Sequence, residues 1–182
     1  MSESERLRFT KNELPPPFNP AIQPKLPINQ WSEERLVKAN RNYAIEYIRN
    51  GIRELSNILG QDRSRELGSL AAKLTGLQYY QSMSRTIGAT DGDCTDAANF
   101  LSTMLQGMGD ATSVSISECG SKATLVHSRL RILRGIKAEN EREDLLTCWI
   151  ELWRGAVQSH QKLLKVTASI YVDRIEWIIE ER

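Results

Sequence analysis

The stretch ATSVSISECGSKATLVHSRLRIL, residues 111–133, decides the fold, because the spacing of apolar residues changes there. Before it, apolar side chains recur every three or four residues, as on one side of a helix. Within it, residues 111–118 and 122–133 form two runs in which apolar and polar side chains alternate. The short break at 119–121 contains a glycine, so the stretch predicts a β-hairpin.

Three helices are predicted before this hairpin. The first begins after Ser32, a suitable N-cap, and ends at Gly60; the second begins at Asp62 and the third at Cys94. Apolar residues recur at helical spacing along the first helix: Leu36, Tyr43, Ala44, Tyr47, Ile48, Ile52, Leu55, Ile58 and Leu59.

The second predicted helix carries two rows of residues with different sizes. The first is its main apolar stripe, made of Leu67, Leu70, Ala71, Leu74 and Leu77. The second is an adjacent row of small residues, Gly68, Ala72 and Gly76. Small side chains at this spacing favour close packing of another helix, and the alternative is the floor of a pocket.

One helix and two strands are predicted after residue 133. Asn140 and Glu143 form a predicted capping pair for a helix that is apolar over a wide arc and is therefore buried on more than one side. The strands cover 163–172 and 175–180, and their core residues are predicted to be Ile170, Val172, Trp177 and Ile179. The order ααα-ββ-α-ββ predicts an α+β fold, with helices packed on one face of a small antiparallel sheet.

Composition places the chain among ordinary globular proteins. It has 182 residues, of which 26% are charged and 40% hydrophobic, and its net charge is +1. The near-neutral charge argues against a nucleic-acid partner, and no apolar run is long enough to span a membrane. Three widely spaced cysteines and a polar start without a signal core predict a cytoplasmic protein.

Residues 1–30 contain all six prolines and are predicted to be an extended arm. The arm also carries apolar residues, so it either packs on the body or on a neighbouring subunit, or is disordered. Residues 31–182 are predicted to form a single domain.

No familiar catalytic, phosphate-binding or metal-binding motif is present in the sequence. The chain has only two histidines, His127 and His160, which cannot form a histidine-rich metal site. We therefore expect neither a metal nor a cofactor.

A basic segment follows the break of the hairpin. If the alternation that begins at Lys122 continues, His127, Arg129 and Arg131 share one strand face, where they could hold a carboxylate or phosphate. The alternative, which we favour, is a solvated outer sheet face with ion pairs to Glu118 or Glu176.

Several aromatic and thiol side chains could line a site but also fit the core. Trp149 and Trp153 share a helix face, and Tyr79 and Tyr80 end the second helix. Cys94 stands at a predicted helix start, which can activate a thiol, but it also fits the apolar stripe of that helix. Cys148, in the most apolar helix, is expected to be buried and inert.

The stretches LAAKLTGLQYY (70–80), LLTCWIELWRGAVQS (145–159) and SIYVDRIEWIIEE (169–181), together with the hairpin, resemble the L-2-amino-thiazoline-4-carboxylic acid hydrolase family. They are also similar to small-molecule-binding domains of the 4-vinyl reductase type. The resemblance implies a helical first half and a reactive cysteine near Asp173 on the last strand. Arg174, Ile175 and Glu176 stand there instead, so the resemblance implies an altered site.

Two functions follow as hypotheses. The first is a hydrolase-like enzyme for a small anionic substrate, such as one of specialised biosynthesis, with Glu176, Glu151 and His127 as acid–base groups. Its substrate-binding residues would be Arg129, Arg131, Arg174, Tyr79, Tyr80, Trp149 and Trp153. The second is a non-catalytic module that binds a small ligand or assembles as a homodimer.

Overall fold

The computed structural model describes residues 32–88, 92–160 and 164–181. The chain divides into two units, 1–36 and 37–182. In the first unit, the Ser32 hydroxyl accepts a hydrogen bond from the backbone N–H of Arg35 at 3.4 Å, as an N-cap does. The predicted arm, residues 1–30, lies outside the described residues.

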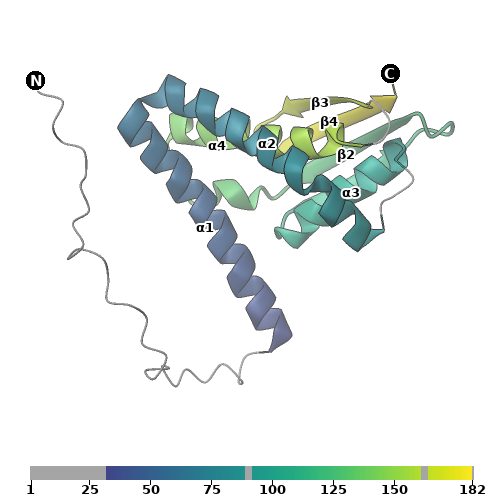
Figure 1. Ribbon diagram of the computed structural model, residues 1–182, viewed down its shortest axis with the longest axis horizontal. Coiled ribbons are helices and arrows are strands. Elements are labelled where there is room, and N and C mark those ends of the chain that lie inside the picture. The colour runs from purple at the N-terminus through teal and green to yellow at the C-terminus, as the bar shows by residue number, and fades with distance from the viewer. Residues whose placement is uncertain (1–31, 89–91, 161–163, 182) are drawn as a thin grey trace, which may run out of the picture. The chain divides into compact units, whose positions relative to one another are not determined.

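The described residues form an α+β fold in the predicted order. The elements are α1 (Glu33–Leu59), α2 (Gln61–Ile87), α3 (Cys94–Gly107), β1 (Ala111–Ile116), β2 (Lys122–Ser128), the 3-10 helix η2 (Arg131–Leu133), α4 (Glu139–Gln158), β3 (Leu164–Ile170) and β4 (Arg174–Glu181) (Figure 1). The predicted fold class is confirmed.

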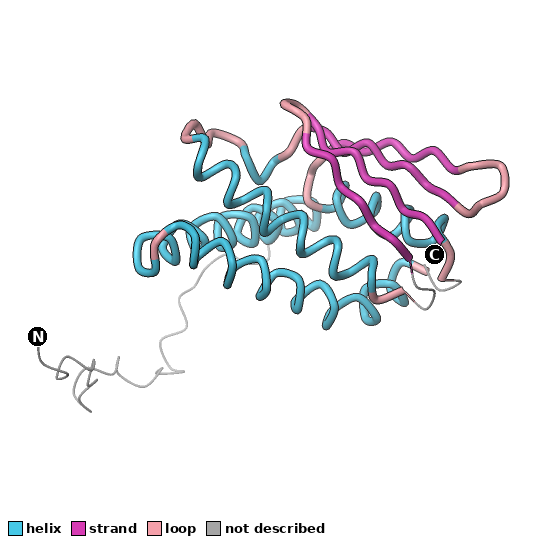
Figure 2. The backbone as a smooth tube through the Cα atoms, turned by 90° about the horizontal axis from the view of Figure 1, so that it is seen from above, coloured by secondary structure: helices cyan, strands magenta, loops and turns pink. Residues whose placement is uncertain are grey.

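The four strands form one antiparallel sheet in the order β1-β2-β4-β3. Leu125 of β2 pairs with Val114 on one side and with Trp177 on the other. Helices cover one face of the sheet (Figure 2), and Leu125, Trp177 and Ile179 on that face are completely buried. Trp149 of α4 belongs to the same core cluster, so indole rings from both layers fill the space between helices and sheet.

The strand predicted over 122–133 is wrong in its second half. β2 ends at Ser128, and Arg129 has a φ of 55°, a left-handed conformation that turns the chain out of the strand. The last hairpin also differs from the prediction: Ile170 is 54% exposed and Val172 is 96% exposed, while Trp177 and Ile179 lie in the core. Val172 lies between β3 and β4, outside both strands.

Helices α2 and α4 approach each other closely enough to exclude side chains at three glycines. A Cβ atom built on Gly76 would collide with the backbone of Leu152 and lie 2.7 Å from the backbone nitrogen of Ala156. A Cβ atom on Gly155 would collide with the backbone carbonyl of Lys73. One on Gly68 would lie 2.9 Å from the sulfur of a cysteine on α4. Close helix packing is therefore the role of Gly76, whereas Gly68 and Ala72 also line a cavity described below.

The predicted main apolar stripe of α2 is not in the core. Its four leucines are all exposed: Leu67, Leu70, Leu74 and Leu77. At 100° per residue, the row of small residues and the row of leucines lie on opposite sides of the helix rather than side by side. Because the glycines take the face toward α4, the leucines point away from it.

Helices α1 and α4 depart from the sequence predictions in opposite ways. α4 is buried on two sides, as predicted, but it begins at Glu139 after Ala138, which makes no side-chain cap, so the Asn140–Glu143 capping pair is wrong. On α1, the apolar residues that carry the helical periodicity are largely exposed, and Tyr43, Tyr47 and Ile58 each keep more than 70% of their surface. The buried residue of α1 is Ile45, which the prediction missed.

Candidate functional site

The three predicted acid–base residues do not converge. Glu176 lies on the face of β4 opposite the buried one, and its carboxylate accepts a hydrogen bond from Arg174 at 2.9 Å. Glu151 lies on α4, where it pairs with Arg154. His127 is completely buried on the helix-facing side of the sheet. The three groups therefore do not form a common site.

His127 forms a buried pair with Asp110, a residue outside the predicted set. Its Nε2 lies 2.7 Å from the Asp110 carboxylate, which also accepts the backbone N–H of Arg131 at 2.8 Å. The predicted solvated face for His127 is wrong, because this side of β2 faces the helices. The pair ties the end of β2 to the residue that precedes β1.

The predicted substrate-binding arginines are also separated. Arg129 is exposed just after β2. Arg174 binds Glu176 and Asp173 and lies over the ring of Tyr171, 4.5 Å from its centroid. Arg131 lies on η2 and is the one of the three that lines a pocket described below.

The predicted aromatic residues lie mainly in the core. The Tyr80 hydroxyl lies 2.7 Å from Nε2 of His160, and burial raises the pKa of Tyr80 to about 12 and lowers the pKa of His160. Trp149 and Trp153 pack edge to face, with ring centroids 5.3 Å apart. The side chain of Tyr79 lies outside the described residues.

The three thiols differ in their accessibility. Cys94 is completely buried at the start of α3, and its thiol donates to the carbonyl of Ser121 at 3.2 Å. Cys148 is buried under α2, and burial raises the pKa of its thiol. Cys119 is exposed in the β1–β2 turn, where hydrogen bonds, first of all from the Ser121 hydroxyl, lower its pKa to about 7.

An apolar cavity of about 450 Å³ lies between α1, α2 and α4. Its lining combines small residues of α2 with larger apolar residues of α1 and α4: Tyr47, Ile48, Gly51, Ile52, Leu55, Gly68, Ala71, Ala72, Thr75, Cys148, Trp149 and Leu152. Trp149 is the one predicted site residue that lines it. Space of this size is typical of small-molecule sites, which span roughly 300–1,000 Å³.

The exposed leucines of α2 are a second candidate for a functional surface. We call Leu67, Leu70, Leu74 and Leu77 the leucine row. They are 38–54% exposed although each is a large apolar side chain. A continuous apolar surface of this kind marks a site of interaction more often than an isolated exposed leucine does.

This arrangement of helices and sheet has a counterpart among solved structures. It is similar to the crystal structure of a trafficking protein particle complex subunit 3 from Naegleria fowleri covalently bound to palmitic acid, with a TM-score of 0.60. The similarity covers 80% of this chain and 96% of that chain at 12% sequence identity, so it concerns the fold. No family model and no curated protein matches this sequence.

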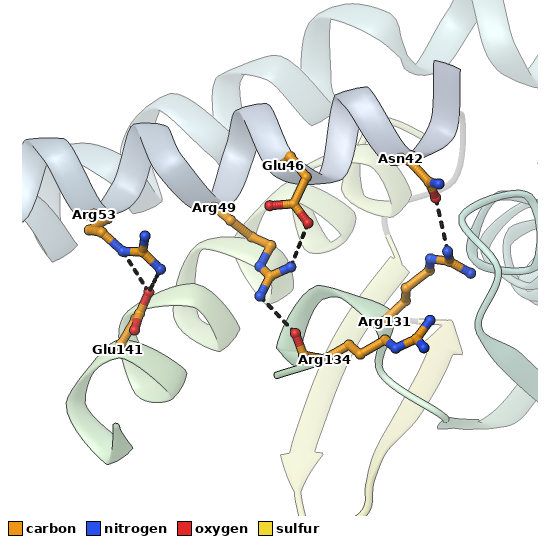
Figure 3. Close-up of polar contacts among 7 residues, drawn as sticks. All are labelled: Asn42, Glu46, Arg49, Arg53, Arg131, Arg134 and Glu141. Atoms are coloured by element: carbon orange, nitrogen blue, oxygen red, sulfur yellow. Dashed lines mark hydrogen bonds and ion pairs between the residues drawn. The ribbon is translucent and has the colours of Figure 1, made fainter. Parts of the chain in front are cut away.

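Three arginines line a pocket of about 480 Å³ between α1 and η2, and two of them lie outside the predicted site residues. Its lining includes Arg49 on α1 and Arg131 and Arg134 at η2, with Ile45 as an apolar residue among them. Figure 3 shows Asn42 and Arg49 reaching from α1 to the η2 residues. The basic segment 122–137 gave a partial signal, but nothing in it indicated the contribution of α1.

The described residues contain neither a metal-binding group of side chains nor a helix that could span a membrane. Within 32–88, 92–160 and 164–181, no three His, Cys, Asp or Glu side chains gather in a group that could hold a metal ion. Over the same ranges, none of the helices combines the length and apolar character needed to cross a bilayer.

Proposed function

We propose that this chain is a non-catalytic assembly module that forms a homodimer through the leucine row of α2. The observation that carries the proposal is the inverted packing of α2. Its glycines are used against α4, and its large apolar side chains remain in water, where they cost free energy until another surface covers them. A partner surface supplies that cover.

The spacing of the leucine row favours a second copy of the same helix as the partner. Leu67 and Leu77 lie five residues on either side of Ala72, and Leu70 and Leu74 lie two residues on either side. The row is therefore symmetric about its centre. An antiparallel two-fold contact would place Leu67 against Leu77 of the other copy and Leu70 against Leu74. The 3-4-3 spacing is also that of a coiled-coil seam.

Charges beside the leucine row are compatible with this contact. In the antiparallel register, Glu66 faces Gln78, Arg63 faces Gln81 and Lys73 faces Ala71 of the other copy. No like charges oppose each other at these positions, and a net charge of +1 adds little repulsion between two copies. The similar structure described above is of a subunit of a larger complex, which supports an assembly role for this fold.

The enzyme hypothesis remains a proposal with less support. Its acid–base residues lie apart, and each of them has a partner: Arg174 for Glu176, Arg154 for Glu151 and Asp110 for His127. The resemblance to thiazoline-carboxylate hydrolases also lacks the implied cysteine near Asp173. The assembly proposal explains the exposed leucine row, whereas the enzyme proposal gives that row no role.

The decisive measurement is the mass in solution, by light scattering coupled to size-exclusion chromatography. We expect twice the chain mass of 20.7 kDa for the wild type and the chain mass for the double variant Leu70→Glu/Leu74→Glu. Val172→Glu is the control, because Val172 is equally apolar and 96% exposed but lies far along the chain, between β3 and β4. A monomeric wild type, or a double variant that stays dimeric, would contradict the proposal.

A second candidate function is the binding of an acyl chain in the cavity between α1, α2 and α4. The supporting observation is a lining composed almost entirely of apolar side chains. The similar structure carries palmitic acid bound covalently, which supports a ligand of this class for the fold. Cys148 lines the cavity, but burial raises the pKa of its thiol and keeps it protonated, so we propose non-covalent binding.

Displacement of a fluorescent fatty acid by palmitate tests this second function. Ala71 lines the cavity from an exposed position, so Ala71→Phe should fill the space without crowding the core and should abolish binding. Ser82→Phe, also exposed on α2 but not part of the lining, should leave binding unchanged. Equal binding by both variants would show that the cavity is not the site.

A further inference from the structure

Four arginines gather where α1 meets the residues around η2. Arg41 and Arg49 come from α1, and Arg131 and Arg134 come from η2 and its C-terminal end. We call them the arginine cluster. The α1 pair and the η2 pair are separated by more than 80 residues of sequence, so the fold brings the pairs together, and three of the four arginines line the pocket of about 480 Å³.

The arginine cluster lacks the carboxylates that would balance it. Arg49 pairs with Glu46 at 2.7 Å and donates to the backbone carbonyl of Arg134 at 2.7 Å. Arg131 donates to Asn42, an uncharged amide, at 2.9 Å. Within the described part of the chain, the guanidinium of Arg134 has no hydrogen bond or ion pair. Glu46 is therefore the one acidic residue in the pocket lining (Figure 3).

Arg41 and Arg131 approach each other at Gly109, and neither forms an ion pair with a carboxylate among residues 32–88, 92–160 and 164–181. The central carbon of the Arg41 guanidinium and Nη1 of Arg131 both lie 3.3 Å from the position that a Cβ atom on Gly109 would occupy. The Nε of Arg41 is buried and has no hydrogen-bond partner. Asp110 is the nearest acid along the chain, and its two oxygens are already used by His127 and by the backbone of Arg131.

Two guanidinium groups lie close together, and a buried donor has no partner among the described residues, so an anion bound here would supply the missing acceptor. We infer that the pocket between α1 and η2 binds the phosphate group of a small phosphate monoester. Arg134 and Arg131 hold the phosphate oxygens, since guanidinium groups bind such oxygens in pairs. The charge of −1.5 to −2 on a phosphate monoester near pH 7 matches Arg131 and Arg134, the two lining arginines without a described carboxylate partner, better than a single carboxylate does.

The remaining volume of the pocket accommodates the group that carries the phosphate. Ile45 gives one apolar surface and Asn42 one polar amide beside the arginines. The phosphate can belong to a soluble metabolite or to the head of a lipid, and both present the same oxygens. The experiment therefore includes a probe for each source.

Isothermal titration calorimetry with glycerol 3-phosphate tests the soluble source, and sedimentation with phosphatidylcholine vesicles that contain phosphatidic acid tests the lipid source. We expect Arg134→Gln to weaken binding about tenfold or more, because it removes a charge-assisted hydrogen bond. Arg129→Gln is the matched control: it removes the same charge from an exposed arginine outside the pocket lining and should leave binding nearly unchanged.

A second variant tests the same site in the opposite direction. Glu46→Gln removes the acid of the pocket lining from an exposed position, and it should strengthen binding of the phosphate. Binding of either probe that responds in this way identifies the source and supports the site. The inference is overturned if neither probe binds, or if Arg129→Gln weakens binding as much as Arg134→Gln does.

Discussion

At the residue scale, Gly76 is a position where one methyl group has a large effect. A Cβ atom there would meet the backbone of Leu152 and of Ala156, which cannot rotate away as a side chain can. We expect Gly76→Ala to lower the free energy of unfolding by about 1–3 kcal/mol or more, because α2 must move off α4. Urea denaturation followed by circular dichroism measures the change.

The matched control for this substitution is Gly51→Ala. Gly51 lies within α1, and a Cβ atom built there meets nothing within 4 Å. The same change should therefore raise the free energy of unfolding by about 0.5–1 kcal/mol through helix propensity. Destabilisation of similar size in both variants would show that propensity, and not the contact between α2 and α4, governs Gly76.

The thiol of Cys119 should be the reactive one in the folded protein. Hydrogen bonds from Ser121 and Ser117 lower its pKa to about 7, so the thiolate fraction, and with it the alkylation rate, should reach half its maximum near pH 7. Cys94 and Cys148 are buried and should react after unfolding. Mass spectrometry after timed iodoacetamide treatment gives the profile. Ser121→Ala should move the midpoint upward, and a wild-type midpoint near 8.5 would refute the expectation.

Single residues were predictable from the sequence where one force dominates. Burial of Trp149, Cys94 and Cys148 followed from apolar periodicity. The orientation of α2 did not, because hydrophobicity alone assigns Leu70 to the core and Gly76 to no particular face. The close approach of two backbones outweighs the burial of leucines here, and that contact depends on Gly155, far away in the sequence.

At the element scale, α1 is attached to the rest of its unit mainly by side chains. Ile45 is 3% exposed and is the buried anchor, with Ile48 and Ile52 packed beside it and Arg53 binding Glu141 at 2.7 Å. We expect Ile45→Ala to lower the free energy that holds α1 in place by about 2–5 kcal/mol. Amide hydrogen exchange should therefore become faster in α1 more than in the sheet. Exchange measured by mass spectrometry distinguishes the two regions.

Ile58→Ala provides the comparison on the same helix. Ile58 is 75% exposed, so its removal should leave exchange in α1 nearly unchanged. Equal acceleration by both variants would mean that Ile45 does not anchor the helix. The prediction missed Ile45, although it lies three and seven residues before Ile48 and Ile52 on the same helix face. The periodicity was followed instead through Tyr43 and Tyr47, which lie on the other side of the helix and are exposed.

Element boundaries were predictable where a capping residue or a glycine marks them. Their prediction was wrong where a contact with a distant residue ends the element. Ser32 and Gly60 mark the limits of α1 as predicted. β2 ends earlier than its alternating pattern, because Arg129 takes a left-handed conformation and the backbone N–H of Arg131 binds Asp110. That carboxylate precedes β1, so no local pattern around residue 129 could reveal it.

At the scale of the whole molecule, the proposed dimer links stability to concentration. If the leucine row is covered in the folded dimer, the melting temperature should rise by roughly 2 °C for each tenfold increase in protein concentration. Leu70→Glu/Leu74→Glu should remove that dependence. Differential scanning fluorimetry over a hundredfold concentration range measures both, and a wild-type melting temperature that does not change would argue for a folded monomer.

The architecture of the whole molecule was predictable, whereas its pockets were predictable only in part: the small residues of α2 indicated a pocket floor, and Gly68 and Ala72 line the cavity beside α4. The change of period near residue 111 was enough to give the order of the elements and the α+β class. The pocket at η2 joins Asn42 and Arg49 to Arg131 across long sequence separations, and the predicted set contained only the last of these. Sequence patterns report local conformation, and a site built from distant elements has no local pattern.

The contact between α2 and α4 also determines which positions can change over evolutionary time. Gly76 and Gly155 lie where any side chain meets backbone, so chains that keep this helix pair must keep glycine there. The leucine row can drift to other apolar residues without altering the fold. Distant relatives would therefore keep a glycine at each of these two positions after their apolar residues had diverged.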